Sequence, residues 1–183
     1  MADFKVEMSR FKDEMSDFKD EMSNYKDENR ATIRDMNRKW GDMANKLGTI
    51  VEDLVAPSLT RIIDETCGET VMDLTVRRKR RLKDGRVQEF DAIAITETSL
   101  FLNSTKSTLR SADVDRFVDE ISAFRTFFPE YDALPLVGIL ASLSVEASVL
   151  NYAEKQGFLV LAIGDQLMDV QNSADFQPKR WLT

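Results

Sequence analysis

The chain has 183 residues, of which 43% are hydrophobic and 31% charged, and it carries a net charge of −7 with a pI near 4.8. This length fits one domain of about 130 residues with an appendage, and no apolar run reaches the ~18–20 residues that cross a bilayer. The absence of histidine excludes Ser–His and Cys–His catalysis and imidazole zinc sites, and the single cysteine excludes an internal disulfide framework. The charged N-terminus favours the cytoplasm, and the acidic balance argues against a general nucleic-acid coat.

The first forty residues contain a seven-residue repeat, MSRFKDE, MSDFKDE and MSNYKDE. Its apolar members are spaced alternately three and four apart, as in the seam of a coiled coil: Met8, Phe11, Met15, Phe18, Met22 and Tyr25. With Met8 at position a, a parallel partner copy brings g glutamates to e lysines, in the pairs Glu7–Lys12, Glu14–Lys19 and Glu21–Lys26. An antiparallel pair would juxtapose like charges. The pattern predicts a parallel homo-oligomeric coiled coil over residues 1–47; the alternative is an amphipathic helix folded against its own domain.

After this repeat the periodicity alternates between helical and extended patterns. Helices are expected at 49–56, ending at Pro57, at 58–66, from an N-cap at Ser111 to about 128, and from an N-cap at Ser144 to about 156. Strands are expected at 71–82, 87–96, 100–107, 136–143, 158–163 and 167–170. The first two strands are joined by a two-residue turn at Asp84-Gly85. This order predicts an α/β domain with a mixed sheet over residues 48–183.

Four charged residues fall where this order would bring them together. Glu89 and Asp91 are expected on one face of the second strand, Lys106 near the end of the third, and Glu52 on the helix before the sheet. A carboxylate beside a lysine on the neighbouring strand suits a hard cation such as Mg²⁺, with the lysine near an attacking water or a phosphate. The alternative is a solvated surface ion pair.

The element order αβββαβ, with EFD on the second strand and a lysine followed by STLR on the third, resembles the PD-(D/E)XK nuclease superfamily. The segments WGDMANKLGTIVEDLVAP, EFDAIAI, KSTLRSADVDRF and FQPKRW resemble an uncharacterised prokaryotic branch of it that carries a coiled-coil leader, over about Trp40 to Trp181. This resemblance implies a restriction-endonuclease-like αβββαβαβ fold. It also implies that Asp91 binds metal, that Lys106 is the motif lysine, and that Glu52 is a helix carboxylate joining the site.

The chain departs from that family pattern at Ser104, where an acid is expected two residues before the lysine. Losing this carboxylate removes a metal ligand, so the resemblance implies a protein that binds or cleaves DNA through a degenerate site, with Mg²⁺ held weakly or not at all. Glu89, Glu97 or Glu52 are the residues that could fill the vacant position. The alternative function is a non-enzymatic oligomerisation or adaptor protein that uses the α/β domain as a scaffold.

A run of cations surrounds the first hairpin of the predicted sheet. Two interpretations remain open, a phosphate-binding ribbon or a charged edge that prevents aggregation. Two arginines near the third strand and the following helix would extend a phosphate-binding surface. The predicted nucleic-acid residues are Arg77, Arg78, Lys79, Arg80, Arg81, Arg110 and Arg116.

Overall fold

A computed structural model shows two units, Met1–Asn45 and Lys46–Thr183, and its long first helix α1 runs from Ala2 to Cys67. The boundary between the units lies two residues before the one expected at 47/48. The structure describes residues 2–165 and 167–182. Within α1, the side chains outside the description are those of residues 2–6, 9, 13, 31, 37, 40–45, 47, 48, 50 and 51.

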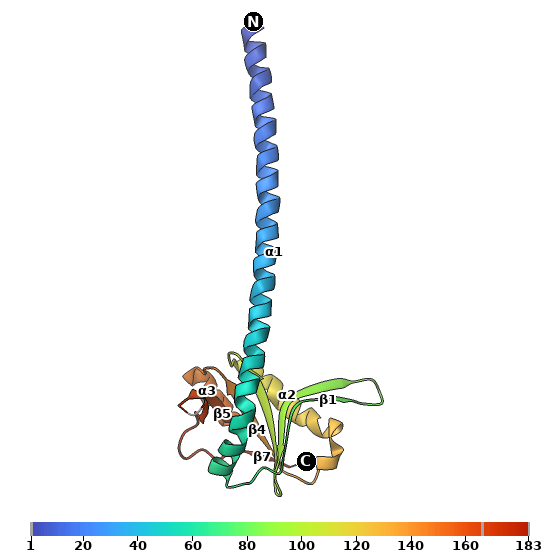
Figure 1. The fold of residues 1–183 in the computed structure, drawn as a ribbon, viewed down its shortest axis with the longest axis vertical. Coiled ribbons are helices and arrows are strands. Elements are labelled where there is room, and N and C mark those ends of the chain that lie inside the picture. The colour runs from blue at the N-terminus through green and yellow to red at the C-terminus, as the bar shows by residue number, and fades with distance from the viewer. Residues whose placement is uncertain (1, 166, 183) are drawn as a thin grey trace. The chain divides into compact units, whose positions relative to one another are not determined.

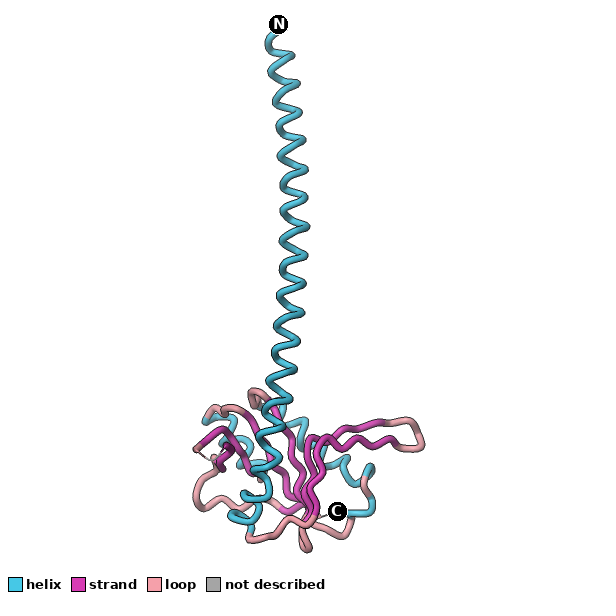
Figure 2. The backbone as a smooth tube through the Cα atoms, viewed as in Figure 1, coloured by secondary structure: helices cyan, strands magenta, loops and turns pink. Residues whose placement is uncertain are grey.

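The first unit is helical along its described length, as Figure 2 shows. All six predicted seam residues are large apolar side chains that stay at least half exposed, from 51% for Met15 to 64% for Tyr25. The six side chains are therefore not buried by other residues of the first unit, and they add no hydrophobic stabilisation to it. Association of this apolar face with a second copy of the chain stays a prediction.

The helix does not stop at Gly48 or Pro57, contrary to the two short helices expected there. A proline inside a helix costs about 3 kcal/mol, because it removes one backbone hydrogen bond and its ring crowds the preceding turn. On this part of α1 four apolar residues are fully buried against the sheet: Val55, Leu59, Ile62 and Ile63. Each contributes roughly 1.5–3 kcal/mol, so packing outweighs the local penalty.

The second unit is built on a mixed sheet, which confirms the expected α/β class. Its strands are β1 (Asp73–Arg81), β2 (Val87–Ile95), β3 (Leu100–Lys106), β4 (Leu136–Ser142), β5 (Leu159–Gly164), β6 (Leu167–Val170) and β7 (Arg180–Trp181). The first six lie in sequence order across the sheet, and β7 pairs with β4. The pairs β1–β2, β2–β3 and β5–β6 are antiparallel, whereas β3–β4 and β4–β5 are parallel. The strand β7 was not expected, because two residues carry no periodic signal.

Helices cover both faces of this sheet (Figure 1). On one face α2 (Ser111–Phe127) and α3 (Ala147–Gln156) enclose an apolar cluster centred on Phe117, Phe124 and Phe158. On the other face the last part of α1 packs over a second cluster formed with β2, β4 and β5. A short 3-10 helix, η1 (Pro129–Tyr131), follows α2. The apolar strand β4 is buried along its whole length, because both faces of the sheet are covered.

Three local expectations are corrected by backbone geometry. The first hairpin is closed by Leu82, whose N–H donates to the carbonyl of Arg86 at 2.9 Å, so the loop has three residues rather than two. Gly85 occupies its left-handed position at φ +92°, which is typical of three-residue hairpins. The residues preceding α2 and α3 are Arg110 and Glu146, so neither expected serine is an N-cap.

Two charged side chains fasten the C-terminal segment to the rest of the second unit. Glu69 accepts a hydrogen bond from Arg180 Nη2 at 2.7 Å, and it also accepts from the hydroxyls of Thr96, Thr98 and Ser99. Arg125, whose side chain is 17% exposed, donates to four backbone carbonyls, those of Tyr131, Asp132, Leu134 and Trp181. Both residues therefore add to the few backbone hydrogen bonds that these loops make.

Candidate functional site

The candidate site is created by a break in the ladder between β2 and β3. The register of this pair ends at Ala92 opposite Asn103, while β2 remains paired with β1 as far as Val87. At the same level of β1, Arg77 adopts a left-handed φ of +50°, an uncommon conformation for a residue with a Cβ. Beyond this point residues 78–90 form a two-stranded ribbon that leaves the sheet (Figures 1 and 2).

The break also interrupts the alternation of side chains along β2. Phe90 packs into the aromatic cluster with Phe124, whereas Ala92, two residues later, packs under α1 on the opposite face. For this reason Glu89 does not accompany Asp91, as regular alternation had led us to expect. Instead Glu89 lies on the ribbon and pairs with Lys79 at 3.5 Å.

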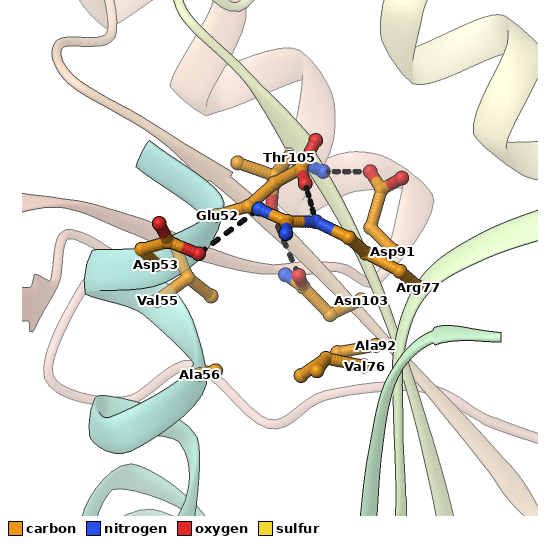
Figure 3. Close-up of a pocket in the computed structure, with 10 residues that line it drawn as sticks. All are labelled: Glu52, Asp53, Val55, Ala56, Val76, Arg77, Asp91, Ala92, Asn103 and Thr105. Carbon is orange, nitrogen blue, oxygen red and sulfur yellow. Dashed lines mark hydrogen bonds and ion pairs between the residues drawn. The ribbon is translucent and has the colours of Figure 1, made fainter. Parts of the chain in front are cut away.

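Asp91 lies at the break. Its side chain accepts a hydrogen bond from the backbone of β3, where a carbonyl of β2 would accept it in a continuous ladder. Its Oδ2 accepts a hydrogen bond from the N–H of Thr105 at 2.6 Å, as Figure 3 shows. Lys106 Nζ lies 4.0 Å from the same oxygen and 3.2 Å from the hydroxyl of Ser104. Burial raises the pKa of Asp91, and nearby Glu52 adds to the increase, while Thr105 and Lys106 oppose it. The structure thus brings Asp91 and Lys106 together at the end of β3.

Glu120 on α2 is a second carboxylate in this place, and it was missed from the sequence. Its pKa is raised to about 7, mainly by burial; the charge of Asp91 adds to the increase and that of Lys106 opposes it. Glu120 is therefore within electrostatic range of both residues. The residues expected to replace the missing acid, Glu52, Glu89 and Glu97, all precede Lys106 in the chain, whereas Glu120 follows it. The one available signal was a charged residue beside the core positions Phe117 and Phe124 of its helix, since a half-buried glutamate is uncommon.

Glu52 lies near the site but is held by another partner. Arg77 Nε donates to Glu52 at 2.7 Å, and Arg77 Nη2 donates to Asp53 at 2.9 Å. Figure 3 shows this pair beside Asp91, around a cavity of about 30 Å³. That volume holds one or two waters and no organic ligand. Glu52 is therefore a neighbour that adds negative charge to the site, with its own charge balanced by Arg77.

The predicted cations divide into paired and unpaired groups. Beside Arg77, the paired ones are Lys79 with Glu89, Arg80 with Glu130, and Arg116 with Asp113 at 3.2 Å. Arg78 and Arg80 also lie over the ring of Phe128, at 5.5 and 4.6 Å from its centroid. Within the described part of the chain, Arg78, Arg81 and Arg110 have no ion-pair partner.

The residues of this site fit a hard divalent cation with few protein ligands. Asp91 and Glu120 are half-buried carboxylates that share one lysine, so their surroundings lack positive charge. No group of three metal-ligating side chains occurs among the described residues. A Mg²⁺ ion commonly uses one or two carboxylates and completes its octahedron with water and phosphate oxygens, which is compatible with such a pair.

Two further findings bear on the class of protein. In the described part of the chain, no helix is long and apolar enough to span a membrane. No protein-family model and no curated protein matched this chain in the comparisons.

Proposed function

We propose that the second unit is a metal-dependent phosphodiesterase of the PD-(D/E)XK type that acts on DNA. The observation that carries the proposal is that Asp91 and Lys106 meet at the carboxyl end of β3, with the half-buried Glu120 of α2 within electrostatic range of both. Ligands of open α/β sheets bind outside the carboxyl ends of parallel strands, and β3 and β4 are parallel. The site therefore lies where such sheets bind ligands, and it contains the carboxylates and the lysine that metal-dependent phosphodiester cleavage requires.

Glu120 changes the interpretation of Ser104. The sequence pattern lacks an acid two residues before Lys106, which implied a degenerate site. A carboxylate from α2 supplies a second negative charge beside Asp91 without occupying that position on β3. Ser104 is buried and its hydroxyl accepts a hydrogen bond from Lys106 Nζ. On this proposal the ligand pair is Asp91 and Glu120.

Each residue has a role that follows from its contacts. A divalent cation held by the two carboxylates would polarise a phosphate oxygen and lower the pKa of a water molecule. Asp91 is oriented by the Thr105 N–H, so its carboxylate needs no rearrangement during the reaction. Lys106 points to the same oxygen of Asp91, and its ammonium group would stabilise negative charge that develops on the phosphate.

The proposal is tested by a plasmid-nicking assay with the full chain in Mg²⁺ or Mn²⁺. Asp91→Asn and Glu120→Gln should each reduce nicking by at least about 100-fold, because each removes a ligand charge from the cation. Glu89→Gln is the matched control, since Glu89 pairs with Lys79 on the ribbon, and it should keep native activity. Absence of metal-dependent nicking by the native chain, or nicking that survives Asp91→Asn, would contradict the proposal and favour a scaffold function.

A further inference from the structure

The ribbon formed by residues 78–90 concentrates positive charge in an acidic protein. Residues 78–90 include six cations and two carboxylates, whereas the whole chain has a net charge of −7. Such a segment attracts polyanions only through charges that are not already neutralised. The contacts of the individual side chains therefore decide which of them are available.

One face of the ribbon is used to hold it in place. Phe90 packs edge-on against Phe124, with ring centroids 5.2 Å apart, and Arg78 and Arg80 lie over Phe128. Arg80 also pairs with Glu130. These contacts join the ribbon to the end of α2, so it is a supported arm rather than a free hairpin.

The distal part of the ribbon carries the unpaired cations. Arg81 and Lys83 are exposed, and neither has an ion-pair partner among the described residues. Their neighbours Lys79 and Arg86 are also exposed, but Lys79 pairs with Glu89 and Arg86 pairs with Asp84 at 2.8 Å. Arg81 and Lys83 are thus exposed cations without an ion pair, whereas Lys79 and Arg86, on the same part of the ribbon, are exposed cations held in ion pairs.

The spacing along the ribbon matches the width of a DNA groove. Arg81 lies four residues beyond Arg77, and Arg77 is at the level of Asp91, so the separation is about 13 Å at ~3.3 Å per residue. The major groove of B-DNA is ~12 Å wide and admits a two-stranded β-ribbon. The major groove of an RNA duplex is too narrow and deep for such an element.

From these contacts we infer that the ribbon is a binding arm for duplex DNA, in which Arg81 and Lys83 contact backbone phosphates across a groove from the site at Asp91. This inference rests on the proposed function, because it takes a phosphate at Asp91 as one end of the span of about 13 Å. Arg77, Lys79, Arg80 and Arg116, which were also expected to bind nucleic acid, serve mainly structural ion pairs. The inference names the substrate class as double-stranded DNA.

The test is fluorescence anisotropy with a labelled 20-base-pair DNA duplex and the full chain, in EDTA so that no cleavage occurs. Arg81→Gln/Lys83→Gln removes two free cations, and Lys79→Gln/Arg86→Gln removes two neutralised cations from the same ribbon. Each lost phosphate contact should reduce the slope of log K against log salt by about 0.9, so the first variant should lose about 1.8. At 0.1 M salt this corresponds to weakening of up to about 60-fold. The control variant should bind within about threefold of the native chain.

Equal weakening by the two double variants would overturn the inference, since net charge alone would then explain binding. Equal native affinity for an RNA duplex of the same length would also overturn it, because groove shape would play no part. Cleavage separates this inference from the proposed function. A native chain that binds DNA through Arg81 and Lys83 but never nicks it would defeat the nuclease proposal and leave the binding arm intact. If the native chain nicks DNA and the Arg81→Gln/Lys83→Gln variant nicks it equally well, only the binding arm is defeated.

Discussion

Glu120→Gln should stabilise the metal-free protein at neutral and alkaline pH while removing a ligand from the proposed site. The pKa of Glu120 rises from its ordinary value of 4.5 to about 7, mainly through burial. Between these values the folded state holds a proton that the unfolded state has released, so the free energy of unfolding falls as pH rises. The shift corresponds to about 3 kcal/mol of stability lost by pH 8. Glutamine keeps the shape of the side chain and has no charge to desolvate.

Urea denaturation at pH 5 and pH 8 in EDTA measures this effect. A Trp40→Phe background leaves Trp181, which stacks on Phe158, as the fluorescent reporter of the second unit. We expect Glu120→Gln to match the native chain near pH 5 and to exceed it by up to about 3 kcal/mol at pH 8. Asp119→Asn is the control, because Asp119 is the exposed neighbour on the same helix and should change little at either pH.

Added Mg²⁺ provides the second half of this experiment. The native chain should gain stability with metal concentration, about 2.7 kcal/mol at 100 times the dissociation constant, and Glu120→Gln should gain much less. A variant that is more stable without metal and less responsive to it is difficult to explain by packing alone. A difference between native and variant that stays constant from pH 5 to pH 8 would refute the reasoning, as would an equal effect from Asp119→Asn.

Three other predictions concern stability and assembly. Arg125→Ala should lower the free energy of unfolding by about 3 kcal/mol in urea denaturation, because four carbonyls lose a charged donor, whereas exposed Arg116→Ala should cost under about 0.5 kcal/mol. Hydrogen bonds from Thr96 and Arg180 outweigh the effect of burial and lower the pKa of Glu69. Its stabilising contribution is therefore present above pH 4.5 and lost as pH falls through the lowered pKa, so Glu69→Gln should flatten an acid-denaturation curve followed by circular dichroism. In the first unit, light scattering should show a native oligomer that dissociates when the e lysines become glutamates and re-forms on mixing with a chain whose g glutamates are lysines; a monomeric native chain would contradict the coiled coil. The lysines are Lys12, Lys19 and Lys26, and the glutamates are Glu7, Glu14 and Glu21.

Local sequence patterns were sufficient for most of the elements. The strand at 167–170 is found at the expected residues, and β2, β3, β4 and β5 begin and end within about a residue or two of the expectation. These strands are short apolar or alternating runs between turn residues, so their identity depends on neighbours a few positions away. The helix ends at Ser111 and Ser144 were less accurate, since several adjacent polar residues can serve as the cap.

The features of the fold that local patterns did not predict depend on contacts between segments far apart in the sequence. Pro57 predicts a helix end, and only the burial of Val55 and Leu59 against the sheet keeps α1 continuous through it. The residues of the apolar seam in the first unit could be identified from the repeat alone, because the three- and four-residue spacing places them on one face of a helix.

The candidate site shows the same division. Asp91 and Lys106 could be named in advance because adjacent strands bring them together, and the structure has them 4.0 Å apart. Glu120 could not, because its proximity depends on how α2 crosses the sheet, fourteen residues after Lys106. Sequence therefore determined which residues carry charge and which lie on strands. Tertiary packing decided which carboxylate lies within electrostatic range of Asp91 and which cations remain free, since both depend on partners that are distant in the chain.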